Sequence, residues 1–216
     1  MTGQFITFEG TDGAGKTTVL NQVVDEIKPA LGKQLLTTRE PGGNPVSEQI
    51  RKVILNKDET DMDDRCEALL FAAARREHLV KTILPALKSN QLVLCDRYLD
   101  SSIAYQGGGR EIGEKAVLDM NQFATEGLMP DTTIYFDVPV DVGLKRIANH
   151  RSGEVNRLDL QEHDFYVRVH DAYDRIAKRD PKRVIKIDAT KPIDEVVNQV
   201  LSVLYKRAGN YFNKNK

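Results

Sequence analysis

Five short stretches along the chain are mainly apolar and rich in Val, Ile, Leu and Phe. Nearly continuous apolar runs of this kind are typical of strands that are covered on both faces of a sheet. The pattern predicts strands at residues 5–9, 35–39, 92–96, 132–138 and 184–188.

Between these runs, apolar residues repeat every three or four positions, which is the spacing of an amphipathic helix. In the first such segment, Gly32 follows the last apolar position and is predicted to cap the C-terminus of the helix. In the second, Pro85 lies inside the repeat, so we expect the helix to kink or end there. The predicted helices span residues 17–31, 65–87, 114–125, 140–148, 159–177 and 193–204.

The alternation of strands and helices predicts an α/β fold: a doubly wound, five-stranded parallel sheet flanked by helices. Ligands of such sheets bind at the carboxyl ends of the strands. The 216 residues suit a single domain spanning residues 1–216. Residues 149–156 interrupt the alternation with small and charged side chains, so we expect a mobile lid insertion at approximately residues 149–158.

Composition and charge exclude several classes of protein. The chain has 31 Lys+Arg against 32 Asp+Glu, which argues against binding nucleic acid through bulk charge. There is no apolar run near the roughly 18 residues of a membrane span, and residues 1–9 lack the pattern of a signal peptide. Cys66 and Cys95 have neither metal-site spacing nor the number for a disulfide framework, and Cys95 is predicted to be buried. We therefore expect a cytoplasmic protein with no nucleic-acid or membrane partner.

The first predicted strand runs directly into a segment with the spacing Gly-x4-Gly-Lys-Thr, which precedes a predicted helix. Glycines let successive backbone N–H groups face an anion, and the helix N-terminus adds positive potential. Lys16 is expected to reach the β- and γ-phosphates of a triphosphate, and the Thr17 hydroxyl to bind Mg²⁺. The predicted triphosphate-binding residues are Gly10, Thr11, Asp12, Gly13, Ala14, Gly15, Lys16, Thr17 and Thr18.

Among proteins that bind triphosphates, a small kinase fits this chain best. A GTPase usually carries an Asn-Lys-x-Asp motif, whereas residues 56–59 end in Glu and do not follow a strand. A motor or helicase would need a longer chain. The third predicted strand ends at Asp96, where a carboxylate can hold Mg²⁺ or its waters, and the neighbouring Arg97 can bind a phosphate through its guanidinium fork.

Two further features concern the substrates. Asp12 places a carboxylate inside the phosphate loop, where it repels a triphosphate unless a cationic or protic group lies opposite. Phe71 and Arg75 are four residues apart on the long predicted helix and so share one face. Such a pair could stack on a base and hydrogen-bond its edge, but the spacing alone favours a core Phe71 and a solvent-exposed Arg75.

Together these segments resemble the thymidylate kinase family, nucleoside monophosphate kinases that phosphorylate dTMP. The resemblance covers about residues 4–205 of the chain. The Arg-Glu-Pro-Gly-Gly segment at 39–43 and the Asp-Arg-Tyr segment at 96–98 are together specific to this family among small kinases. The matching segments are residues 8–18, 38–43, 67–78, 96–107, 130–131 and 156–159.

The resemblance implies how the thymine base and the sugar are recognised. Thymine would stack on Phe71 and receive a hydrogen bond from Arg75, with Ser102 and Gln106 on the other side of the base. Tyr105 would crowd the sugar C2′ position and disfavour a ribose hydroxyl. The predicted substrate-binding residues are Arg51, Phe71, Arg75, Arg97, Ser101, Ser102, Tyr105 and Gln106.

The resemblance also implies how the phosphates are handled. Arg51 and Arg97 would clamp the acceptor phosphate, and Asp12 would contact the acceptor 3′-hydroxyl or order Mg²⁺. The phosphate loop has no Arg, whereas the predicted lid contains Arg151 and Arg157, so the chain resembles the lid-arginine type found in many bacteria. The predicted catalytic residues are Asp12, Lys16, Arg97, Arg151 and Arg157, and the predicted metal ligands are Thr17 and Asp96.

The activity that the resemblance implies is transfer of the γ-phosphoryl group of ATP to dTMP, giving dTDP and ADP in a step of dTTP synthesis for DNA replication. It also implies Mg²⁺ as a cofactor and a homodimer, to which the helix over residues 65–87 would contribute. Residues 56–61 depart from the family pattern, and no role is carried over to them.

Two alternatives remain open from the sequence. A deoxynucleoside kinase would need a carboxylate base aimed at a free 5′-hydroxyl, and Glu40 is the candidate; Arg51 and Arg97 would then face no phosphate. A non-catalytic nucleotide-binding switch would have no use for the lid arginines or the acceptor-side residues.

Overall fold

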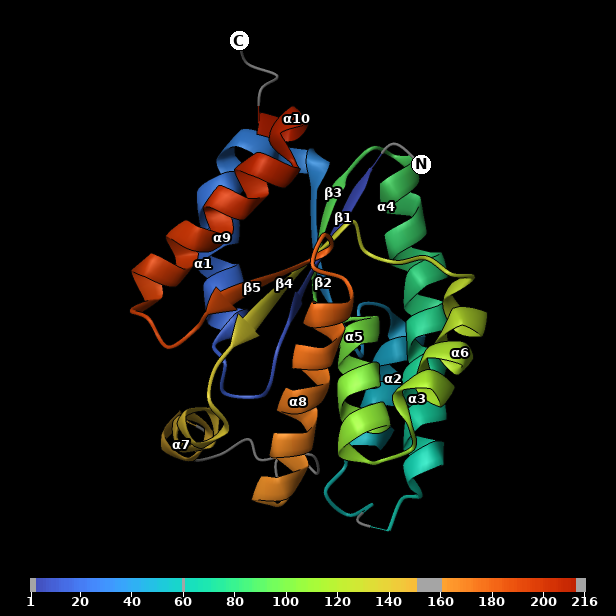
Figure 1. Ribbon diagram of the computed structural model, residues 1–216. Coiled ribbons are helices and arrows are strands. Elements are labelled where there is room, and N and C mark those ends of the chain that lie inside the picture. The colour runs from blue at the N-terminus through green and yellow to red at the C-terminus, as the bar shows by residue number, and fades with distance from the viewer. Residues whose placement is uncertain (1–2, 60, 151–160, 213–216) are drawn as a thin grey trace.

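Five parallel strands form one sheet in the order β2-β3-β1-β4-β5, in a computed structural model that describes residues 3–59, 61–150 and 161–212 (Figure 1). From β1 the chain passes to the edge strand β2, returns to β3 beside β1, and then crosses to β4 and β5 on the other side, which confirms the predicted doubly wound α/β fold. The strands are β1 (Gln4–Glu9), β2 (Leu35–Arg39), β3 (Leu92–Asp96), β4 (Thr132–Asp137) and β5 (Val184–Asp188).

Helices lie on both faces of this sheet (Figure 1). Gly32 ends α1 with a positive φ of 51°, as predicted for a C-terminal cap. The helix predicted over 159–177 is observed as α8, and its first two predicted residues lie outside the described part of the chain. The helices are α1 (Lys16–Leu31), α2 (Pro45–Leu55), α3 (Asp64–His78), α4 (Leu84–Lys88), α5 (Leu99–Ser102), α6 (Glu114–Thr125), α7 (Val140–His150), α8 (His163–Arg179), α9 (Ile193–Arg207) and α10 (Gly209–Phe212).

The strands alternate their side chains between two hydrophobic layers. On β1, Phe5 packs with residues of α4 and α8, whereas Ile6 packs with residues of α1 and α9. On β3, Leu94 belongs to the layer with α1 and α9, and Cys95 belongs to the layer with α4 and α8. Cys95 is fully buried in the layer beside α8, which confirms the prediction that it serves as a small apolar residue.

The long helical segment does not end at Pro85. A π-helical stretch, Leu79–Ile83, follows α3, and Pro85 then occupies the first turn of α4. Proline is tolerated in the first turn of a helix because the N–H that it lacks has no partner there in any case. Of the two outcomes predicted for Pro85, a kink or an end, the end is not observed, and the break in the regular α-helix is the π-helical turn just before the proline.

Besides the short α10 and the 3-10 turn Gly32–Gln34, two helical segments have no counterpart among the predicted elements. Helix α2 buries only Ser47 and Ile54, so its apolar pattern is weak, and the Asn44 side chain caps it by accepting from the Ser47 N–H at 3.1 Å. Helix α5 and the π-helical stretch Ile103–Gly109 that follows it are buried at nearly every position. A segment that is buried all round has no polar face and therefore no amphipathic period.

Because all the strands are parallel, their carboxyl ends meet at one edge of the sheet, where the phosphate loop between β1 and α1 lies (Figure 1). Gly13 in this loop has a φ of +76°, and a Cβ there would lie 2.2 Å from the Gly143 carbonyl oxygen on α7. The loop therefore packs against α7 at a distance that only glycine permits. Within the described residues, the helices are too short or too polar to cross a membrane.

Candidate active site

A single cavity of about 880 Å³ opens at the carboxyl edge of the sheet and gathers most of the predicted site residues. Gly10 and Thr11 do not line it, and Arg151 and Arg157 lie outside the described residues. The predicted residues that line the cavity are Asp12, Gly13, Ala14, Gly15, Lys16, Thr17, Thr18, Arg51, Phe71, Arg75, Asp96, Arg97, Ser101, Ser102, Tyr105 and Gln106.

The phosphate loop holds its lysine in a buried, preorganised position. Lys16 Nζ donates to the carbonyl oxygens of Gly10 at 3.0 Å and Thr11 at 2.8 Å. Burial, together with the nearby positive charge of Arg97, lowers the pKa of Lys16 to about 8. Helix α1 begins at Lys16, so its positive N-terminal end faces the same space. An anion bound in the loop would offset this lowering of the pKa and favour the charged form of the lysine.

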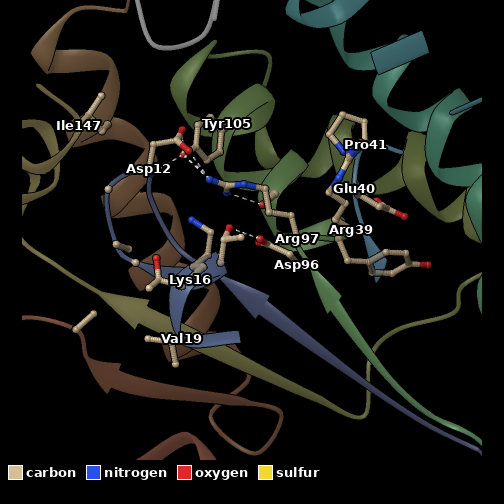
Figure 2. A pocket seen from close by; sticks show the side chains of 18 of the residues that line it. Asp12, Lys16, Val19, Arg39, Glu40, Pro41, Asp96, Arg97, Tyr105 and Ile147 are labelled. Carbon is tan, nitrogen blue, oxygen red and sulfur yellow. Dashed lines mark hydrogen bonds and ion pairs between the residues drawn. The ribbon is translucent and has the colours of Figure 1, made fainter. Parts of the chain in front are cut away.

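Thr17, in the first turn of α1, meets Asp96 at the end of β3. The Thr17 hydroxyl donates to Asp96 Oδ2 at 2.6 Å (Figure 2). Asp96 Oδ1 is buried, and it has no hydrogen-bond partner among the described residues. A buried carboxylate oxygen without a donor is chemically suited to a hard cation, because oxygen ligands are what Mg²⁺ prefers. The pair fits a magnesium site, as the phosphate-loop pattern predicts.

Arg97 supplies the cationic group that Asp12 requires. Its Nη2 donates to Asp12 Oδ1 at 2.8 Å, and the Tyr105 hydroxyl donates to Asp12 Oδ2 at 2.8 Å (Figure 2). Arg97 Nη1 also donates to the Gly10 carbonyl oxygen at 2.9 Å and to Ser101 Oγ at 3.0 Å. Arg97 is therefore the cationic group and Tyr105 the protic group that Asp12 needs opposite it. These hydrogen bonds connect the phosphate loop to the segment that follows β3.

Glu9, at the end of β1, is a site residue that the sequence reasoning missed. Its buried carboxylate accepts from the Tyr98 N–H at 2.7 Å, Ser101 Oγ at 2.5 Å and the Tyr173 hydroxyl at 2.9 Å. Burial, and then the negative charge of Asp100, raise the pKa of Glu9 to about 7. Glu9 thereby fixes Ser101, which in turn accepts from Arg97. The sequence signal that could have identified Glu9 is its position at the end of an apolar strand, directly before the glycines of the phosphate loop.

Arg75 is buried, so the solvent-exposed position that its spacing favours is wrong. Its guanidinium donates through Nε to Glu40 Oε2 at 2.8 Å, through Nη1 to Ser102 Oγ at 3.0 Å and to Asn121 Oδ1, and through Nη2 to the Tyr98 carbonyl oxygen at 3.0 Å. These acceptors come from other segments of the chain, which a helical period cannot reveal.

Phe71, four residues before Arg75, is only partly buried and faces the cavity, so the core position that its spacing favours is wrong as well. The aromatic ring and the guanidinium both line the cavity, and they come from α3, which packs against the π-helical stretch Ile103–Gly109. An aromatic surface beside a donor-rich group suits a planar heterocycle.

Glu40 is fully engaged as a structural anion. Besides accepting from Arg75, its Oε1 faces His78 Nδ1 at 3.0 Å, and His78 Nε2 lies 2.7 Å from Thr38 Oγ1. Only 4% of Glu40 is exposed. A carboxylate held by a guanidinium and an imidazole is poorly placed to take a proton from a hydroxyl, which weighs against the deoxynucleoside kinase alternative.

The remaining cavity walls hold Arg51, which was predicted, and three cations that were not: Arg39, Arg146 and Lys191. Arg39 and Arg51 both donate to the Pro41 carbonyl oxygen, at 2.8 Å and 3.0 Å, and line the side of the cavity near β2. On the side near β5, Arg146 of α7 donates to the Ala189 carbonyl oxygen at 3.1 Å and lines the cavity with Lys191. The cavity is therefore bordered by arginines at both ends.

Comparison with known proteins agrees with the resemblance. A family model described as thymidylate kinase matches residues 8–200. The thymidylate kinase of Lactiplantibacillus plantarum is 57% identical over 211 residues, covering 98% of this chain and 96% of that protein. That of Pediococcus pentosaceus is 59% identical over 204 residues, covering 94% and 98%. A crystal structure of thymidylate kinase from Ehrlichia chaffeensis is similar with a TM-score of 0.76 and 35% identity, covering 94% of this chain and 99% of that one.

Proposed function

The chain belongs to the thymidylate kinase family and phosphorylates dTMP to dTDP, and on that premise we propose which of its residues carry out the transfer. One observation supports the assignment above the others. The phosphate loop, the Arg51–Arg97 side and the Phe71–Arg75 end border a single cavity. A donor triphosphate and an acceptor nucleotide can thus meet head to head inside it.

On the donor side, ATP binds with its phosphates along the loop from Gly10 to Thr18. Lys16 neutralises the β- and γ-phosphates, and the backbone N–H groups at the start of α1 hold the same oxygens. Mg²⁺, held by the Thr17 hydroxyl and the Asp96 carboxylate, would supply further neutralisation of phosphate charge.

On the acceptor side, Arg97 and Arg51 bind the phosphate of dTMP, and Tyr105 borders the sugar while it holds Asp12. Phe71 stacks on thymine. Arg75, Ser101, Ser102 and Gln106 complete the acceptor pocket around the base and the sugar.

The reaction needs alignment and charge neutralisation more than proton transfer. The attacking phosphate oxygen of dTMP is already an anion at neutral pH, so no general base is required. The one candidate base, Glu40, is held by Arg75 and His78. Closure of the lid would exclude water, which would otherwise compete as acceptor.

A coupled assay across four acceptors tests this assignment. We expect turnover with dTMP, weaker turnover with dUMP, and none with dGMP or thymidine. Thymine and uracil differ by one methyl group, which is worth only about 1–3 kcal/mol of discrimination. Faster turnover with thymidine than with dTMP would contradict the acceptor-phosphate role of Arg51 and Arg97, and complete rejection of dUMP would show that another contact reads the methyl group.

The lid arginines complete the proposed transition-state clamp. We expect Arg151→Ala or Arg157→Ala to lower kcat more than about tenfold while the protein stays folded, with the larger effect at Arg157, because a lid arginine neutralises charge on the transferring phosphoryl group. Steady-state kinetics measures kcat and circular dichroism measures folding, and Arg179→Ala on α8 serves as the control. Unchanged turnover in both lid variants would remove the arginines from the mechanism.

The exposed apolar side chains support a homodimer. Val53 of α2 is 48% exposed, Leu69 of α3 59% and Phe123 of α6 90%, and α3 packs against both α2 and α6. Large exposed apolar side chains on helices that pack together are typical of a subunit interface. Sedimentation of the purified chain tests for the dimer. We also propose that residues 1–216 act as one cytoplasmic domain whose lid spans approximately residues 149–158.

A further inference from the structure

The amide of Gln106 is held in one orientation by a buried carboxylate. Gln106 Nε2 donates to Glu67 Oε1 at 2.9 Å, and both side chains are almost completely buried. Glu67 Oε2 accepts from Arg110 Nη2 at 3.0 Å, so both oxygens of this carboxylate face hydrogen-bond donors. A carboxylate can only accept hydrogen bonds, and the NH₂ group of Gln106 must therefore be the end that faces it.

This orientation leaves the carbonyl oxygen of Gln106 for the cavity. Gln106 lines the cavity together with Phe71 and Ser102. Within the described part of the chain, Gln106 Oε1 receives no hydrogen bond. The base end of the cavity consequently offers an acceptor at this position, and a donor cannot be offered there without turning the amide away from Glu67.

Arg75 offers the opposite polarity in the same pocket. A guanidinium has five N–H groups and no acceptor. Four hydrogen bonds bind it to Glu40, Ser102, Asn121 and the Tyr98 carbonyl oxygen, which leaves one N–H on Nη2. The pocket is therefore lined by a donor group, Arg75, and an acceptor, Gln106 Oε1, each fixed by a buried carboxylate: Glu40 for Arg75 and Glu67 for Gln106.

We propose that Glu67 is a positioning residue that selects for a 4-oxo pyrimidine by fixing the amide of Gln106. The inference rests on the proposed binding of the base beside Phe71. A 4-oxo pyrimidine has a hydrogen-bond donor at N3 and an acceptor at O4, which complement Gln106 Oε1 and the remaining N–H of Arg75. A 4-amino pyrimidine reverses both groups, so it would place acceptor against acceptor and donor against donor.

The substitution Glu67→Gln tests this role. A Gln side chain at position 67 can donate to Gln106 Oε1, so the Gln106 amide can turn and present its NH₂ group to the cavity. We expect the ratio of kcat/KM for dTMP over dCMP to fall at least about fivefold, the effect of losing one hydrogen bond. A merely structural role would lower both values together and leave the ratio unchanged. If Glu67→Gln lowers the dTMP over dCMP ratio by less than about fivefold, the proposal is overturned.

Asp64→Asn is the matched control, because Asp64 also pairs with Arg110, at 3.2 Å, but no hydrogen bond joins it to Gln106. It should leave the ratio within about twofold of the wild-type value. If Glu67→Gln does not fold, Gln106→Met decides the matter, since it keeps the size of the side chain and removes the acceptor. An unchanged ratio in Gln106→Met overturns the proposal, and a fall of at least about fivefold supports it. Wild-type turnover of dTMP in the same assay tests the proposed function separately.

Discussion

Replacement of Lys16 by alanine is expected to lower kcat for phosphoryl transfer from ATP to dTMP by at least about a thousandfold. Lys16 is the cation at the centre of the phosphate loop, where its Nζ is held by the carbonyl oxygens of Gly10 and Thr11. Burial already lowers the pKa of this ammonium group to about 8, so its charge is costly without a phosphate and most effective beside one. Steady-state kinetics at saturating ATP measures the loss.

Lys28→Ala is the matched control for Lys16→Ala. Lys28 lies on the same helix, α1, but is exposed and lies outside the lining of the cavity. Its replacement should leave kcat within about twofold of the wild type, with both variants showing the circular dichroism of the folded chain. A Lys16→Ala protein that keeps a tenth or more of the wild-type kcat would refute the phosphate-loop assignment.

Arg97→Ala is expected to lower kcat/KM for dTMP by about a thousandfold, because it removes a guanidinium that we place on the acceptor phosphate. The structure adds a second consequence. Arg97 also neutralises Asp12 through the 2.8 Å contact, so its loss leaves more negative charge inside the phosphate loop. The KM for ATP should therefore rise as well, although Arg97 belongs to the acceptor side.

A double-mutant cycle separates these two effects. Asp12→Asn in the Arg97→Ala background removes the excess negative charge, so the KM for ATP should return toward the wild-type value, while kcat/KM for dTMP stays low. The same kinetics on Asp12→Asn alone completes the cycle, and Arg76→Ala, in a surface ion pair with Glu126, is the control. Equal KM values for ATP in the single and the double variant would show that Arg97 does not act on the loop through Asp12.

The strands and the phosphate loop could be predicted because each is encoded by contiguous residues. The strand–helix alternation was enough to predict a parallel, doubly wound sheet, though not its strand order, and Lys16 and Thr17 could be assigned from their place between a strand and a helix. Helix α2 was not predicted because it buries few residues, and the helical segment from Leu99 to Gly109 was not predicted because it is buried on every side. Both failures come from the same cause, since periodicity reports only the contrast between a buried and an exposed face.

The residues alone were enough to predict the chemistry at the carboxyl edge of the sheet: a phosphate loop, a carboxylate at the end of β3 and an arginine beside it. They could not assign the partners. Arg97 meets Asp12 across 85 residues of chain, and Arg75 meets Glu40 across 35. Parallel strands bring their ends together only once the sheet has formed, so the tertiary structure decides which charges face one another and which groups remain for a ligand.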